Sequence, residues 1–174
     1  MFQRVDFMEK GEKYVQMALE MGAEDAKVIS IDDIVFDPRP LLKCMYGCSD
    51  WGKRWTCPSS AKGLRPWEAE RILKRYNWGI LIHTDNASLA HEMSFKVEMA
   101  AFFDDYPLAF SMIDCYLCET CAFPEPCRNP KKARPEAMGL GIDVYATAKK
   151  QGLPIKVLTS RDEKKNYYAF VMIE

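Results

Sequence analysis

The chain has 174 residues, a formal net charge of −1, and a composition that is 48% hydrophobic and 28% charged. This balance is typical of a folded globular protein and excludes a disordered chain, and the length suits one domain with its own core. The near-zero net charge gives no general attraction to nucleic acid or to anionic membranes, so we expect neither as a partner.

The first third of the chain predicts one helix, one strand and a long loop. Apolar residues at helical spacing predict a helix over residues 8–21, closed by Gly22. Val28, Ile29 and Ile31 then predict a strand, which residues 34–36 continue. Repeated proline and glycine over residues 38–65 are typical of a loop, and this loop contains the first three cysteines.

The middle of the chain alternates helix and strand patterns. A proline at the first turn predicts a helix over residues 66–76, followed by a buried strand over 78–83. A second helix is expected over 87–103 and another apolar strand over 108–113. Residues 114–135 then predict a second loop, which holds the other four cysteines.

The last part of the chain completes the fold class. We predict a helix over residues 142–151, stopped by Gly152, and strands over 155–158 and 167–173. No repeat or flexible linker divides the sequence, so residues 1–174 are expected to form a single domain. Its predicted class is α/β, with a small mixed sheet flanked by helices and two cysteine-rich metal-binding loops.

The location follows from what the chain lacks. No run of about 18 uncharged apolar residues is present, so we expect no membrane span. The first ten residues carry charges every few positions, unlike a secretory signal. We therefore expect a reducing, cytoplasmic location, where the seven cysteines persist as thiols or metal ligands rather than as disulfides.

The second loop contains the stronger metal-binding motif. Its first three cysteines, Cys115, Cys118 and Cys121, follow the Cys-x2-Cys-x2-Cys spacing that wraps a [4Fe–4S] cluster in bacterial ferredoxins. The fourth, Cys127, is separated from the third by five residues instead of three, and its proline stands at position 130. Four cysteines also suit structural zinc, but zinc sites usually pair two Cys-x2-Cys knuckles across a longer arm. The spacing favours a cluster over zinc.

The first loop carries Cys44, Cys48 and Cys57, the last followed by Pro58. Three interpretations stay open for this set. It forms a three-thiolate cluster with one iron open to substrate or to Asp50, or Cys57 joins the second loop as a remote cysteine–proline ligand, or the set is a small zinc knot.

The histidine, aromatic and basic residues of the chain distinguish less clearly between these kinds of metal site. His83 and His91 lie far in sequence from both loops and are expected to be packed or surface side chains rather than ligands. Aromatic residues near the cysteines are candidates for an apolar shell around a cluster: Tyr46, Trp51, Trp55, Tyr116 and Phe123. A basic segment close behind Cys127 is expected to be a solvated face, to offset an anionic cluster, or to bind an acidic partner or an anionic substrate: Arg128, Lys131, Lys132 and Arg134.

These cysteine motifs together resemble a known family. The segments 43–48, 55–58, 115–128 and 134–144 are similar to domain of unknown function 2284, the predicted metal-binding proteins common in anaerobic bacteria and archaea. The resemblance spans about residues 12–174, with Ser59 in place of a second proline. It implies metal binding by the cysteines and an anaerobic host, but no reaction.

The sequence holds no phosphate-binding glycine loop, nucleophile elbow or radical-enzyme motif. We therefore expect a [4Fe–4S] protein, with one cluster or two, that transfers electrons to a redox partner protein or supports a partner enzyme. One alternative is a small iron–sulfur enzyme that binds a small-molecule substrate at an open iron. The other is a zinc-stabilised interaction module.

Overall fold

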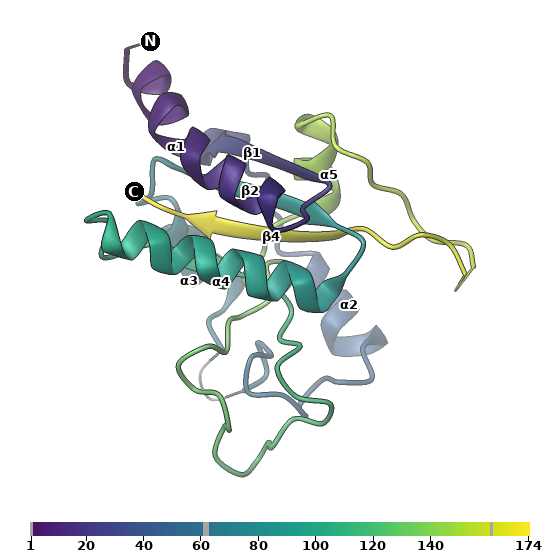
Figure 1. Cartoon of the computed structure of the whole chain (residues 1–174). Helices are drawn as coiled ribbons and strands as arrows, with labels where there is room; N and C mark the ends of the chain where they lie inside the picture. The colour runs from purple at the N-terminus through teal and green to yellow at the C-terminus, as the bar shows by residue number, and fades with distance from the viewer. Residues whose placement is uncertain (1, 61–62, 161) are drawn as a thin grey trace.

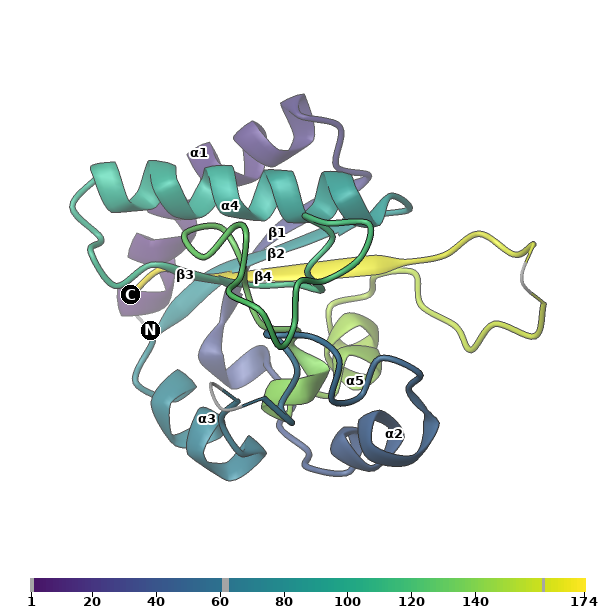
Figure 2. The same ribbon diagram turned by 90° about the horizontal axis from the view of Figure 1, so that it is seen from below.

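Two layers of helices enclose a sheet in the computed structural model, which describes residues 2–60, 63–160 and 162–174. Helices α1 (Phe2–Glu20) and α4 (Ala87–Phe103) cover one face of the sheet. Helices α3 (Pro66–Leu73) and α5 (Val144–Lys150) lie on the opposite face, while the second cysteine loop lies between the two helix layers (Figure 1, Figure 2). The loops are therefore attached to one side of a closed α/β frame.

The sheet has four strands in the order β1-β2-β4-β3. These are β1 (Asp25–Ser30), β2 (Trp78–Thr84), β4 (Tyr167–Met172) and β3 (Phe110–Met112). Every neighbouring pair is antiparallel, with Ile80 of β2 opposite Val28 of β1 and Val171 of β4. The α/β class is confirmed, while the sheet is antiparallel throughout instead of mixed. The strand order places β4, the last strand in sequence, between β2 and β3.

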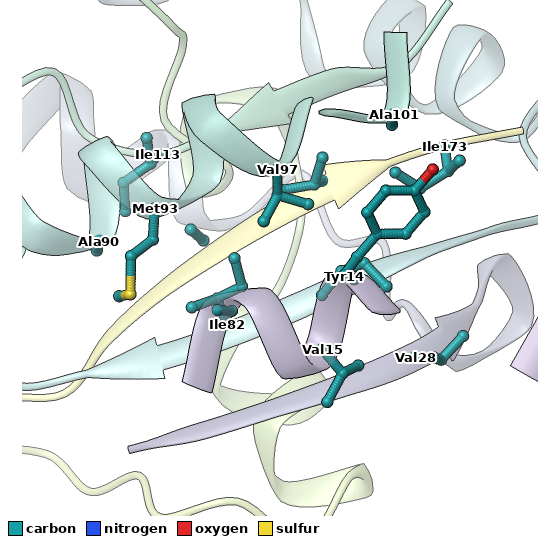
Figure 3. Close-up of a cluster of buried hydrophobic side chains, with 14 of the residues drawn as sticks. Tyr14, Val15, Val28, Ile82, Ala90, Met93, Val97, Ala101, Ile113 and Ile173 are labelled. Carbon is teal, nitrogen blue, oxygen red and sulfur yellow. The ribbon is translucent and has the colours of Figure 1, made fainter. Parts of the chain in front are cut away.

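Both faces of the central strands are buried, because side chains alternate between two apolar clusters. On the face covered by α1 and α4, Ile82 of β2 packs near Val97 of α4 and Tyr14 of α1 (Figure 3). On the other face, Leu81 and Phe170 pack with residues of α3 and α5. This explains why the β2 segment is an unbroken apolar run in the sequence, and its predicted range is confirmed.

The predicted helix over residues 87–103 is confirmed at both ends. Asn86 caps it, because its side-chain oxygen accepts a hydrogen bond from the Leu89 amide at 3.0 Å. In the described part of the chain no helix is long and apolar enough to cross a membrane.

Three sequence predictions were wrong in detail. The first cysteine loop contains a helix, α2 (Pro40–Gly47), because Pro40 sits in its first turn and good helix formers follow. Residues 155–158 form no strand, and Val157 is exposed. Residues 34–36 do not extend β1, since the short helix η1 (Ile31–Asp33) intervenes and Phe36 forms an isolated bridge with Ile142.

Candidate metal centre

The two cysteine loops lie against each other, although 48 residues separate them in the sequence (Figure 2). Arg54 of the first loop donates a hydrogen bond to the Cys115 carbonyl of the second at 3.0 Å. Trp55 donates from its indole nitrogen to the Glu125 carbonyl at 2.7 Å, and its ring meets that of Phe123 edge-on at 5.0 Å. These contacts make one cysteine-rich lobe from two segments.

All four cysteines of the second loop line one small cavity beneath Trp55 and Thr56. Each of these cysteines is partly buried: Cys115, Cys118, Cys121 and Cys127. Asn129 lies on the same cavity and donates its side-chain N–H to the Cys118 sulfur at 3.2 Å. A hydrogen bond to a ligating sulfur is typical of cluster sites, so this donor set fits a four-thiolate centre.

The three cysteines of the first loop line a second cavity, with a volume of about 130 Å³. Cys44 lies on α2, and Cys48 is the residue that ends that helix. Cys57 lies in a turn, in which its backbone amide donates to the Arg54 carbonyl at 3.2 Å. Cys48 is exposed while the other two are partly buried. Cys115 touches both cavities, so the two thiol groups are direct neighbours.

The buried thiols are unfavourable places for negative charge without a cation. Burial raises the pKa of Cys44 to about 11, with Glu136 and the two other first-loop thiols adding repulsion. Burial likewise raises the pKa of Cys57 and of Cys115, which lies close to the other thiols of its own loop. A metal centre would supply the positive charge that thiolates require here.

Three carboxylates share the cavity of the first-loop thiols: Asp50, Asp114 and Glu136. Burial and the neighbouring Asp114 raise the pKa of Glu136 to about 7, even though its oxygens accept the amides of Met138 and Gly139 at 2.9 and 2.8 Å. Burial raises the pKa of Asp114 as well, against the opposing effect of Arg54. The cavity therefore combines thiols with two carboxyl groups, Asp114 and Glu136, whose pKa values are raised.

Asp50, which the sequence suggested as an extra iron ligand, faces the predicted thiols but has a partner of its own. Its carboxylate forms an ion pair with Arg54 at 2.6 Å. Because Arg54 also holds the Cys115 carbonyl, Asp50 belongs to the contact between the loops. Asp114 and Glu136 are the acids that sequence reasoning missed.

Helix α4 fixes the base of the second loop. The ring nitrogens of His91 lie 3.2 Å from the Asp114 carbonyl and 3.0 Å from the Lys132 carbonyl, one on each side of the loop. Two turns further along the helix, buried Glu98 accepts hydrogen bonds from the Ser111 amide at 2.8 Å and from Arg134 at 2.8 Å. Residues His91 and Glu98 thus tie both ends of the loop to the same helix face.

The histidines are packed side chains, as the sequence predicted. His91 is 3% exposed and holds the loop, while His83 is fully buried between Asp25 and Asn166.

The aromatic shell is only partly present. Trp51 and Tyr116 line the first-loop cavity, and Trp55 lines the second, but Tyr46 is 83% exposed and covers neither.

The basic segment behind Cys127 has two different parts. Arg134 is buried in its ion pair with Glu98, and Arg128 donates back to the Thr120 carbonyl at 3.0 Å. Lys131 and Lys132 are exposed. Across residues 38–65 and 114–135 together, ten Lys and Arg oppose four Asp and Glu, so these segments carry +6 while the rest of the chain carries −7.

Within residues 2–60, 63–160 and 162–174, no three histidine, cysteine or acidic side chains are gathered as ligands of one metal ion. The second-loop cavity nevertheless brings four thiols to one space, and thiolates are ligands of both zinc and iron–sulfur clusters.

Comparison with known proteins identifies one relationship. The family model described as "Predicted metal-binding protein (DUF2284)" matches residues 27–173 of the chain. Neither the curated proteins nor the solved structures include a match. The matched range contains all seven cysteines and Glu136.

Proposed function

The chain belongs to the DUF2284 family of predicted metal-binding proteins, and we propose that it is an iron–sulfur protein with two neighbouring clusters. One [4Fe–4S] cluster would be held by the second loop, through Cys115, Cys118, Cys121 and Cys127. The other would be held by three first-loop thiolates, Cys44, Cys48 and Cys57, and would leave one iron without a cysteine.

The observation that carries this proposal is that the thiols of each loop line their own cavity, four of the second loop in one and three of the first loop in the other, with Cys115 bordering both. A single cluster accepts four cysteines and leaves three without a role. The shared arrangement, in which Cys57 joins the second loop, has less support because Cys57 lines the first-loop cavity and not the four-thiol cavity.

The charge of the lobe supports anionic centres. A cluster with thiolate ligands is negatively charged, and the two cysteine segments carry +6 in a chain that is otherwise acidic. Zinc held by the same residues has less support, since the Cys-x2-Cys-x2-Cys spacing of the second loop resembles that of ferredoxins more than the paired knuckles of zinc sites. A structural zinc module nevertheless stays a testable alternative.

We propose electron transfer to a partner protein as the role of this pair. An iron–sulfur cluster supplies reversible one-electron chemistry when it is bound. Because Cys115 touches both cavities, the two centres would be adjacent, and Arg54 and Asn129 would orient the ligands of the second-loop centre. We propose a reducing environment for the protein, where its cysteines persist as thiols or metal ligands.

A second function is favoured by the acids in the first-loop cavity. Asp114 and Glu136 face the same space as three thiols that leave one iron open, and acids with raised pKa values suit proton transfer to a substrate. In that case the protein would be a small enzyme whose substrate binds at the open iron.

Analysis of iron and acid-labile sulfide in protein purified without oxygen tests the proposal. Two clusters predict about eight iron and eight sulfide per chain at most, and a paramagnetic signal after reduction with dithionite. Stoichiometric zinc without sulfide, even after reconstitution with iron, would contradict the iron–sulfur assignment. Reoxidation of the reduced protein by an added substrate, without a partner protein, would favour the enzyme.

A further inference from the structure

A larger cavity, of about 440 Å³, lies between the two thiol cavities and the inner side of α3. It touches Cys57 of the first loop at one point and Cys127 of the second at another. Glu136, which also lines the first-loop cavity, forms part of its wall. This cavity is therefore the space that adjoins both cysteine sets.

The wall of this cavity is mainly apolar. Its apolar side chains come from α3, β3, η2 (Met138–Leu140) and the first loop, namely Leu64, Ala69, Ile72, Leu73, Phe110 and Leu140. Tyr76 also lines it, but its hydroxyl already donates to the Leu108 carbonyl at 2.6 Å. Within the part of the chain that the structure describes, no lysine, arginine or histidine lines it.

These properties restrict the ligand. An anion would lose its hydration without meeting a cationic side chain among the described lining residues, and such a transfer is strongly unfavourable. Both carboxylate oxygens of Glu136 already accept backbone amides, so this group is not a free partner for a cation. The volume falls in the usual range for small-molecule sites, and walls of this kind typically bind uncharged organic molecules.

We propose that this cavity binds an uncharged, largely apolar small molecule of aromatic-ring size. The ligand enters beside Ile72, which lines the cavity and is 49% exposed on α3. Bound there, it contacts Cys57 and Cys127, and thus lies next to both proposed clusters. The inference extends the proposed function by naming a substrate class, while binding itself requires no iron.

The test is equilibrium dialysis of the neutral probe N-phenyl-1-naphthylamine against protein prepared without oxygen, with iron measured in the same samples. The wild type is expected to bind one equivalent. Ile72→Arg places a charge at the mouth and should weaken binding at least tenfold. Trp67→Arg is the matched control, since Trp67 is 62% exposed on the same helix and does not line the cavity.

Ala133→Trp fills the cavity from the second loop and gives an independent second variant. Weakened binding in both variants, with normal binding in Trp67→Arg and helix content unchanged by circular dichroism, would support the site. Absence of saturable binding to the wild type, or wild-type affinity in Ile72→Arg, would overturn it. Probe binding by a folded protein that takes up no iron even after reconstitution would support this site and refute the iron–sulfur assignment.

Discussion

The sheet with its helices and the cysteine lobe are stabilised in different ways. The sheet lies between two apolar clusters that include Ile80, Phe170 and Val171, all fully buried. Of the described residues in 38–65 and 114–135, none belongs to either cluster. The lobe instead holds thiols, acids and hydrogen bonds from Arg54 and Trp55.

This difference indicates what the metal would contribute. Burial of apolar surface is available to the sheet without any cofactor. The lobe brings thiols, most of them partly buried, close to carboxyl groups, and their repulsion favours protonated groups in the absence of a cation. We therefore expect the metal to order the lobe and to leave the sheet largely unaffected.

Removal of the metal is expected to have the largest effect, and it tests this contrast directly. After chelation, amides of residues 115–127 should exchange with solvent at least about 100-fold faster, because the loop loses its internal cross-links. Amides of β2 and β4 should change less than about threefold. Hydrogen–deuterium exchange with mass spectrometry measures both segments in one sample.

Equal acceleration in the loops and the sheet would show that the metal stabilises the whole domain. Unchanged exchange in residues 115–127 would show that the hydrogen bonds from Arg54, Trp55 and His91 suffice to order the loop.

The next largest effect is expected from breaking the ion pair that joins helix α4 to the second cysteine loop. Glu98→Gln removes the charge that pairs with buried Arg134, while the Ser111 contact can partly persist. We expect a loss of about 3 kcal/mol in the free energy of unfolding, as for other buried pairs that lose one partner. Chemical denaturation measures it.

Glu92→Gln is the matched control on the same helix. Glu92 pairs with Lys96 at 2.7 Å, but both side chains are more than half exposed, so the loss should be far smaller than in Glu98→Gln. Equal effects of the two substitutions would mean that Arg134 is not held by a buried charge.

A smaller change in the free energy of unfolding is expected when the pH of the iron-free protein is raised. The pKa of Glu136 is raised from 4.5 to about 7 in the folded state, so between these values the folded chain holds a proton that the unfolded chain has lost. Stability should therefore fall as pH rises through this window.

Glu136→Gln should remove a decline on the order of 2 kcal/mol between pH 4.5 and 7.5. The measurement is the slope of the unfolding free energy against pH. Titration of Glu136 changes this slope, whereas a weakened hydrogen bond to a backbone amide lowers stability equally at every pH. Glu125→Gln, at an exposed position in the second loop, should keep the wild-type slope. A slope unchanged by Glu136→Gln would contradict the charge placement in the first-loop cavity.

The sequence anticipated the sheet better than the lobe, for a physical reason. Strand β2 and helix α4 have apolar patterns whose period matches their geometry, so their ranges could be read directly. Helix α2 was missed because prolines and glycines flank a run of only eight residues. The antiparallel strand order depends on pairing between distant segments, which no local pattern encodes.

The candidate site was also only partly predictable, because contacts between distant segments leave no local pattern in the sequence. The cysteine spacing identified the candidate ligands, but Glu136 lies far from the first loop in sequence and joins its cavity only through the fold. Its place in the 134–144 segment, one of those that resemble the family, was the available signal. His91 gave no signal at all, because its partners are backbone carbonyls.

The central claim is that the thiols form two separate centres, and paired triple variants test it most directly. Iron and sulfide per chain should be measured, without oxygen, in the wild type, in Cys44→Ser/Cys48→Ser/Cys57→Ser and in Cys118→Ser/Cys121→Ser/Cys127→Ser. Each variant is expected to keep about half of the wild-type iron and one intact cluster signal. Full retention of iron in the first variant, or complete loss in either variant while the sheet stays folded, would contradict two independent centres.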